Sequence, residues 1–106
     1  MESGRRGTAA YTASKGGVTS LTRAMANDHL KDNIRVNCVC PGPTDTPLLR
    51  QSRTKQQLKA FVGGLPARKL QAPEEIAKTV LFLASDEAVA LTGAAVPVDR
   101  GQTAHL

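Results

Sequence analysis

A tyrosine and a lysine four residues apart, Tyr11 and Lys15, are the pair in this sequence best suited to acid–base chemistry. Residues four apart on a helix lie one above the other on the same face, so the phenol and the ammonium group can share one small volume. A nearby cation favours the phenolate form, and a phenol so placed can exchange a proton with an oxygen near neutral pH. The alternative is an ordinary solvated pair on an exposed helix surface, which contributes little.

The helix that must carry this pair is predicted over residues 9–30, with a turn at residues 32–33 that stops it. An amphipathic stripe follows spacings of three and four along this helix and consists of Tyr11, Ser14, Val18, Leu21 and Met25. Gly16 and Gly17 each cost a helix interior about 1 kcal/mol relative to alanine. Their presence therefore suggests packing against another helix or the close approach of a flat ligand.

A strand is predicted over residues 34–40, and it must end in a loop because residues 41–43 read Pro-Gly-Pro. In open α/β sheets ligands bind outside the carboxyl ends of the strands, so residues 41–46 are the expected place for a bound small molecule. The loop offers hydroxyl groups, a carboxylate and free backbone groups. A second interpretation is compatible with the first, namely that Thr46 is the N-cap of a helix and Pro47 its first residue.

The rest of the chain completes an alternating pattern. Residues 48–65 predict a short helix and loop, a firm helix follows from Pro73, and a last strand is predicted over residues 94–99, where Pro97 indicates a sheet edge. Helix, strand, helix, strand is typical of a parallel sheet with crossover helices, although two strands alone make a marginal sheet. Residues 1–106 are therefore predicted to form a single partial α/β domain.

Composition excludes several function classes. The formal net charge is +5, yet the basic residues are spread along the chain and aromatic residues make up only 3% of it. Nucleic-acid binding is therefore disfavoured, because few rings can stack on bases. No apolar run approaches the ~18 to 20 residues of a membrane span, and the expectation is a soluble cytoplasmic protein.

Two cysteines, Cys38 and Cys40, alternate along the predicted strand and should point to one face of the sheet. A metal site that recruits His29 or His105 is the less favoured interpretation, because this spacing matches no recognised set of ligands. The favoured role for both thiols is that of small buried hydrophobic side chains.

A set of motifs in fixed order resembles the C-terminal part of a short-chain dehydrogenase/reductase, and the match runs nearly from end to end. The motifs are Tyr11-Thr12-Ala13-Ser14-Lys15, Asn33-Ile34-Arg35-Val36-Asn37, Pro41-Gly42-Pro43-Thr44-Asp45-Thr46-Pro47, Pro73-Glu74-Glu75-Ile76-Ala77, Phe82-Leu83-Ala84-Ser85-Asp86, Thr92-Gly93 and Val98-Asp99. The resemblance implies a Rossmann-type doubly wound parallel sheet, of which this chain holds helix, strand, helices and edge strand.

The resemblance also implies an activity, the interconversion of an alcohol and a carbonyl compound with NAD or NADP as cofactor. Tyr11 would act as general acid/base, and Lys15 would favour its phenolate and hold the nicotinamide ribose. Residues 48–65 would form the mobile lid over a small-molecule substrate. The Tyr11 helix resembles one that commonly packs against a second subunit, which implies a homo-oligomer. The cofactor-binding residues implied are Tyr11, Lys15, Pro41, Gly42, Thr44 and Thr46.

The departures from the family pattern carry equal weight. The 106 residues contain no glycine-rich phosphate loop, Ser3 and Thr8 are misplaced for the substrate-orienting serine, and Arg100 stands where the family has glycine. Without a phosphate cradle at a helix N-terminus, most of the dinucleotide's binding energy has no source. The chain alone is therefore expected to be inactive. The alternative function is a non-catalytic interaction fragment that associates with itself or with a complete homologue through uncovered apolar faces.

Overall fold

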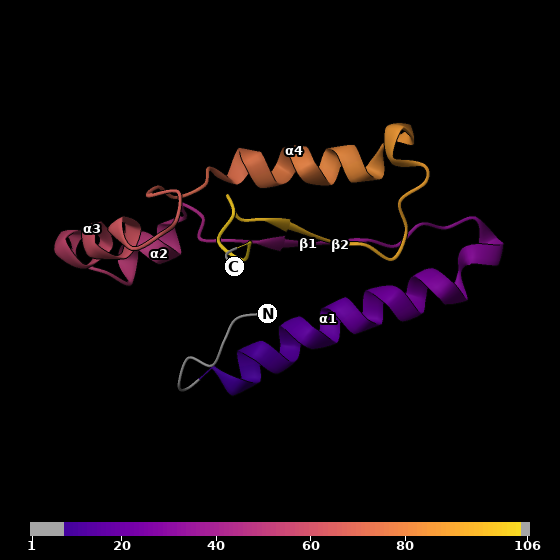
Figure 1. The fold of residues 1–106 in the computed structure, drawn as a ribbon, viewed down its shortest axis with the longest axis horizontal. Helices are drawn as coiled ribbons and strands as arrows, with labels where there is room; N and C mark the ends of the chain where they lie inside the picture. The colour runs from indigo at the N-terminus through magenta and orange to yellow at the C-terminus, as the bar shows by residue number, and fades with distance from the viewer. Residues whose placement is uncertain (1–7, 105–106) are drawn as a thin grey trace.

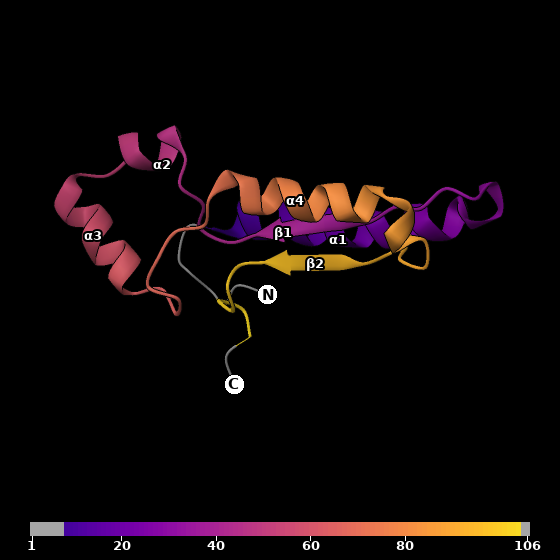
Figure 2. The same cartoon turned by 90° about the horizontal axis from the view of Figure 1, so that it is seen from above.

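The computed structural model describes residues 8–104, and a two-stranded parallel sheet forms its centre. The sheet pairs β1 (Cys38–Pro41) with β2 (Ala95–Val98), so that Cys38 lies opposite Ala95 and Pro41 opposite Val98. Two long helices, α1 (Ala9–Asp28) and α4 (Pro73–Ala84), lie on opposite faces of this sheet (Figure 1). Figure 2 shows the same layers from above, with both helices lying alongside β1 and running opposite to its chain direction. The predicted parallel sheet with flanking helices is confirmed.

Two short helices follow β1. They are α2 (Pro47–Gln51) and α3 (Lys55–Gly63), and both project beyond the carboxyl ends of the strands (Figures 1 and 2). Thr54 and Gln57 form a capping box at the start of α3: the Gln57 N–H donates to the Thr54 hydroxyl at 3.1 Å, and the Thr54 N–H donates to the Gln57 side chain at 2.9 Å. The segment predicted as one short helix and loop therefore contains two capped helices.

The strand begins later than the sequence predicts, at residue 38 instead of residue 34. The residues just before it still pair with the chain that leads into β2, but partly through a side chain. The Gly93 N–H donates to the Val36 carbonyl at 2.7 Å, whereas the Ala94 N–H donates to the side-chain oxygen of Asn37 at 3.0 Å. Because an amide side chain replaces a backbone partner, the regular ladder starts only after Asn37.

α1 turns a different face to the sheet from the one its apolar stripe predicts. Its buried residues are Thr22 and Ala26, and the stripe that contains Val18 and Leu21 is exposed. A Cβ placed on Gly93 would lie 3.4 Å from the Ala26 Cβ, so small residues permit close contact between α1 and the turn that leads into β2. The helix ends at residue 28, and a left-handed Asn33 (φ 59°) completes the predicted turn.

Apolar residues circle most of the axis of α4 in the sequence, which predicts burial on several sides, and this prediction is wrong for the described residues. Leu83 is buried at 9% relative exposure, whereas Leu81 is 71% exposed and Val80 and Phe82 are also exposed. A helix packed on a two-stranded sheet has one covered side, so its other apolar positions remain open. α1 is likewise covered on one side only, so nothing in the described structure lies within 4 Å of a Cβ placed on its Gly16 or Gly17.

Candidate active site

Tyr11 and Lys15 come together on the first two turns of α1. The Lys15 Nζ lies over the Tyr11 ring, 5.3 Å from its centroid, which is within the range of a cation–π contact. Tyr11 is 53% exposed and Lys15 is half-buried. The phenol can therefore be approached from outside the helix while the ammonium group lies close to its ring.

Lys15 also lies near the carboxyl end of β1, as its influence on Cys40 shows. Burial raises the pKa of the Cys40 thiol above its ordinary value of 9.0, the adjacent Cys38 thiol raises it further, and the charge of Lys15 acts in the opposite direction. The two thiols therefore share one face of the strand, as predicted. The α1 end that carries Tyr11 and the loop after β1 lie at the same end of the molecule (Figures 1 and 2).

The loop that follows β1 is held against the end of β2. The Gly42 N–H donates to the Val98 carbonyl at 3.0 Å, and a Cβ on Gly42 would stand only 2.7 Å from the Asp99 Cβ. A side chain at position 42 is therefore excluded by the neighbouring strand itself. Pro41 is the last residue of β1 and is exposed, so its ring is open to a ligand.

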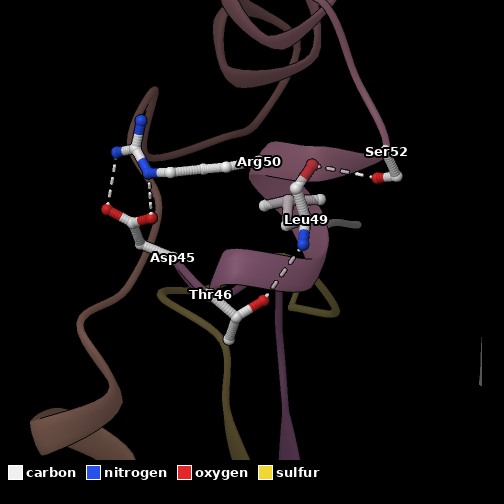
Figure 3. Close-up of polar contacts among 5 residues, drawn as sticks. All are labelled: Asp45, Thr46, Leu49, Arg50 and Ser52. Carbon is white, nitrogen blue, oxygen red and sulfur yellow. Dashed lines mark hydrogen bonds and ion pairs between the residues drawn. The ribbon is translucent and has the colours of Figure 1, made fainter.

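The two threonines of the loop use their hydroxyl groups in opposite ways. The Thr44 hydroxyl donates to the Gly42 carbonyl at 2.9 Å, which leaves its lone pairs as acceptors. The Thr46 hydroxyl accepts from the Leu49 N–H at 3.3 Å as the N-cap of α2, which leaves its own O–H as a donor (Figure 3). The predicted cap at Thr46, with a proline at the first helical position, is confirmed.

An ion pair joins the last turn of α2 to the loop. Arg50 donates to both oxygens of Asp45, at 2.6 and 2.7 Å (Figure 3). The hydrogen bonds from this guanidinium hold the pKa of the Asp45 carboxyl below its ordinary value of 3.8, and they raise the pKa of Arg50. Both oxygens of the Asp45 carboxylate are therefore occupied by hydrogen bonds from Arg50.

Gln71 is a structural residue of this site that no pattern in the sequence predicts. Its side chain, 2% exposed, donates to the Val98 carbonyl. Its backbone N–H donates to Pro43 at 3.1 Å, and its carbonyl accepts from Asp45 at 2.8 Å. Gln71 therefore closes residues 46–70 into a loop whose two ends meet beside β2, and we call this segment the clasped loop. A polar residue three positions before Glu74 carries no periodic signal, so only the fold reveals it.

The end of β2 carries the departure noted in the sequence. Arg100 adopts a left-handed backbone (φ 49°), a conformation that favours glycine, and its side chain forms an ion pair with Glu75 in the first turn of α4. Asp99 accepts from Gly101 and Thr103, and these hydrogen bonds, chiefly that of the Thr103 side chain, lower its pKa below the ordinary 3.8. Arg100 thus joins the sheet to α4.

Comparison with known proteins decides the family. Residues 1–103 match a family model described as enoyl-(acyl carrier protein) reductase. A rat protein, dehydrogenase/reductase SDR family member 6, is 42% identical over 96 residues, which cover 86% of this chain and 39% of that protein. The chain belongs to the short-chain dehydrogenase/reductase family. The resemblance predicted from the motifs is confirmed.

Further similarities agree with this short-chain dehydrogenase/reductase assignment. The 2-(S)-hydroxypropyl-CoM dehydrogenase 3 of Xanthobacter autotrophicus is 45% identical over 101 residues, covering 91% of this chain and 40% of that enzyme. The crystal structure of a short chain dehydrogenase family protein from Francisella tularensis superposes with a TM-score of 0.89 at 35% identity, covering 97% of this chain and 47% of that one. The predicted α/β fold class is therefore confirmed.

The chain spans about two fifths of the length of the curated relatives it matches. Oxidoreductases are the class to which these named relatives belong. Within residues 8–104, no helix is both long enough and apolar enough to cross a membrane.

Proposed function

We propose that this short-chain dehydrogenase/reductase chain supplies the catalytic tyrosine and the nicotinamide-side loop of an NAD(P)-dependent oxidoreductase acting on a small alcohol or carbonyl compound. The observation that carries the proposal is the Lys15 ammonium group 5.3 Å from the ring centroid of an accessible Tyr11. In this role the Tyr11 hydroxyl gives a proton to the carbonyl oxygen during reduction, or takes the alcohol proton during oxidation. Lys15 stabilises the phenolate and offers N–H donors to ribose hydroxyls.

The loop after β1 offers both a hydrogen-bond donor and a hydrogen-bond acceptor, as a nicotinamide carboxamide requires. A carboxamide presents an NH₂ donor and a carbonyl acceptor, whereas the Thr44 hydroxyl retains acceptor capacity and the Thr46 hydroxyl retains its donor. The exposed ring of Pro41 offers a flat apolar edge beside them. These residues fit NAD or NADP equally, and the bound cofactor would supply the hydride.

We further propose that residues 1–106 do not turn over substrate by themselves. No Gly-x-Gly-x-x-Gly run occurs among them, so the pyrophosphate has no cradle of backbone N–H groups at a helix N-terminus. Binding of the nicotinamide half alone is the activity expected of this chain. Assays with a panel of simple alcohols and ketones should therefore show no turnover.

Titration of the chain with NADH and with NADPH, followed by cofactor fluorescence, tests this proposal. We expect weak saturable binding that falls about tenfold in Lys15→Ala, because charged hydrogen bonds are lost. Arg23→Ala on the same helix is the matched control and should bind as the unchanged chain does. Equal binding by Lys15→Ala, or no binding by a chain shown to be folded, would contradict the proposal.

A second candidate function is that of an interaction module without catalysis. It is favoured by the exposed apolar stripe of α1, which includes Val18 and Leu21, and by the exposed Leu81 of α4. Such faces favour association with a second copy of this chain or with a complete homologue. Neither function calls for nucleic acid or membrane.

A further inference from the structure

The positive charge of this chain is concentrated in the clasped loop. Of fourteen basic and nine acidic side chains in the chain, residues 46–70 hold six basic and no acidic ones. The remaining residues therefore carry eight basic and nine acidic side chains and are close to neutral. The six cations are Arg50, Arg53, Lys55, Lys59, Arg68 and Lys69.

The fold tethers this charge to the candidate active site. Both ends of the clasped loop meet at Gln71, whose backbone bonds to Pro43 and Asp45 lie within the loop after β1. The helices between these ends, α2 and α3, project beyond the carboxyl ends of the strands (Figures 1 and 2). Charges of one sign gathered beside a site attract ligands of the opposite sign.

Most of these cations have no carboxylate partner in the described part of the chain. Arg50 is the exception, since it is paired with Asp45. Lys69 interacts electrostatically with Glu75, which already pairs with Arg100. Lys55, Lys59 and Arg68 make no ion pair within residues 8–104. A loop so charged gains from an anionic ligand.

Arg53 is the side chain best prepared to receive an anion. Its guanidinium stacks on the Phe61 ring at 4.4 Å from the centroid, and the residue is half-buried between α2 and α3. Within the described residues it donates one hydrogen bond, to the Ser52 hydroxyl at 3.4 Å, although a guanidinium has five N–H donors. Stacking fixes the plane of the group, and the free donors suit the two oxygens of a carboxylate, phosphate or sulfonate.

We infer that the clasped loop selects substrates that carry an anionic group, with Arg53 as its main contact and the neighbouring lysines supplying attraction at longer range. That the anionic ligand is a substrate rests on the proposed oxidoreductase function. The substrate class is then a small alcohol or carbonyl compound bearing a carboxylate, phosphate or sulfonate. Arg53 acts as a specificity-determining residue and takes no part in proton transfer.

Binding of small anionic alcohols in the absence of cofactor tests the inference. The ¹⁵N-labelled chain is titrated with 3-hydroxybutyrate, glycerol 3-phosphate and 2-hydroxyethanesulfonate, and with their neutral counterparts 1,3-butanediol, glycerol and ethylene glycol. At least one anion should shift resonances of the clasped loop and bind roughly tenfold more tightly than its neutral counterpart. Equal responses to anion and neutral compound, or no response to any of the three anions, would overturn the inference.

Variants identify the residue responsible. Arg53→Gln should lower the affinity for the responding anion roughly tenfold, Arg53→Lys should lower it less, and Arg23→Gln on α1 should leave it unchanged. An equal loss in Arg23→Gln would show a general charge effect and refute the role of Arg53. These titrations need neither cofactor nor turnover. Anion binding can therefore be absent while Lys15-dependent NADH binding is present, or present while NADH binding is absent, so the two proposals are tested separately.

A titration with a nucleotide distinguishes an anionic group on the substrate from a phosphate of the cofactor. Adenosine 2′,5′-bisphosphate, which carries cofactor-like phosphates without nicotinamide, should leave the Arg53 and Phe61 resonances unmoved. If it shifts them more strongly than the small anionic alcohols do, the clasped loop binds cofactor phosphate and the assignment to substrate is wrong. If an acidic peptide binds the clasped loop and the small anions give no response, the ligand of this loop is a protein partner and the assignment to substrate is likewise wrong.

Discussion

Single residues at the strand ends fix the geometry of the candidate site, and Gly42 illustrates this most directly. A Cβ at position 42 would meet the Asp99 Cβ at 2.7 Å, whereas one at position 16 meets nothing within 4 Å. Gly42→Ala should therefore destabilise the chain by about 1–3 kcal/mol through overpacking. Gly16→Ala should stabilise it by about 0.5–1 kcal/mol, because alanine favours a helix interior. Urea unfolding compares the two, and equal stabilities would contradict the close approach.

Acid should weaken the turn that follows β2. The Asp99 pKa is lowered by hydrogen bonds from Thr103 and Gly101, so the folded state favours its ionised form. This contribution to the unfolding free energy is present above the ordinary pKa of 3.8 and is lost as pH falls through the lower, folded value. Asp99→Asn should flatten the dependence of stability on pH below about 4.

Asp86→Asn is the control for this experiment, because the exposed Asp86 side chain makes no hydrogen bond within residues 8–104. Its pH profile of thermal unfolding should follow that of the unchanged chain. If Asp99→Asn and Asp86→Asn gave the same profile, the hydrogen bonds to Asp99 would contribute nothing to acid stability.

At the scale of residues, sequence predicts what depends on local spacing. The helical interval predicts that Tyr11 and Lys15 meet, and the run at Thr46 and Pro47 predicts a capped helix; the structure confirms both placements. The catalytic roles of the pair stay predictions. Gln71 could not be found, because its importance arises from contacts with Val98 and Pro43, which are distant in sequence.

Among the elements, α4 depends on a distant arginine to satisfy its last carbonyl groups. Arg35 donates to the carbonyls of Leu83, Ser85 and Leu91 at 2.8, 3.1 and 3.2 Å. Leu83 lies at the end of the helix, where no intrahelical donor remains, whereas the Ser85 and Leu91 carbonyls also accept from the Ala88 N–H and the Asn37 side chain. Arg35→Met should lower the unfolding free energy by about 1–3 kcal/mol, since charged hydrogen bonds are lost.

Thermal unfolding measures this loss, with Arg23→Met as the matched control on an exposed position of α1. The control should change stability by less than about 0.5 kcal/mol. An Arg35→Met chain as stable as the control would show that the hydrogen bonds from Arg35 make no net contribution to stability.

Element boundaries show where local patterns are insufficient. The run before residue 38 has strand-forming residues, yet Asn37 bonds to Ala94 through its side chain and delays the ladder. The apolar stripe of α1 predicts an amphipathic helix but not the face it turns to the sheet. Thr22 and Ala26 lie on that face, and the small Ala26 side chain allows close approach to Gly93 in the turn before β2.

The whole molecule exposes more surface than a compact domain of its mass. Its accessible surface is 7962 Å² and its radius of gyration 15.9 Å, against about 5,700 Å² and about 13 Å for a compact folded chain of this size. The excess reflects the open faces of α1 and α4 and the projecting clasped loop. Sequence predicts the fold class, because element order is local information, but which faces stay uncovered depends on what packs against them.

The open faces predict self-association. Sedimentation velocity should show an average mass that rises with protein concentration, because pairing covers apolar surface. Leu21→Gln, on the exposed stripe of α1, should weaken the association, whereas Ser20→Gln on the same helix should not. A single monomeric species at all concentrations would contradict the interaction role and leave the catalytic proposal unaffected.

We expect this chain to hold the nicotinamide half of a dinucleotide and not its adenosine diphosphate half. The most direct test is NMR titration with the two halves separately, reduced nicotinamide mononucleotide and ADP-ribose. The mononucleotide should shift the resonances of Lys15, Gly42 and Thr44, whereas ADP-ribose should leave them unchanged. Tighter binding of ADP-ribose, or no response to the mononucleotide by the folded chain, would contradict it.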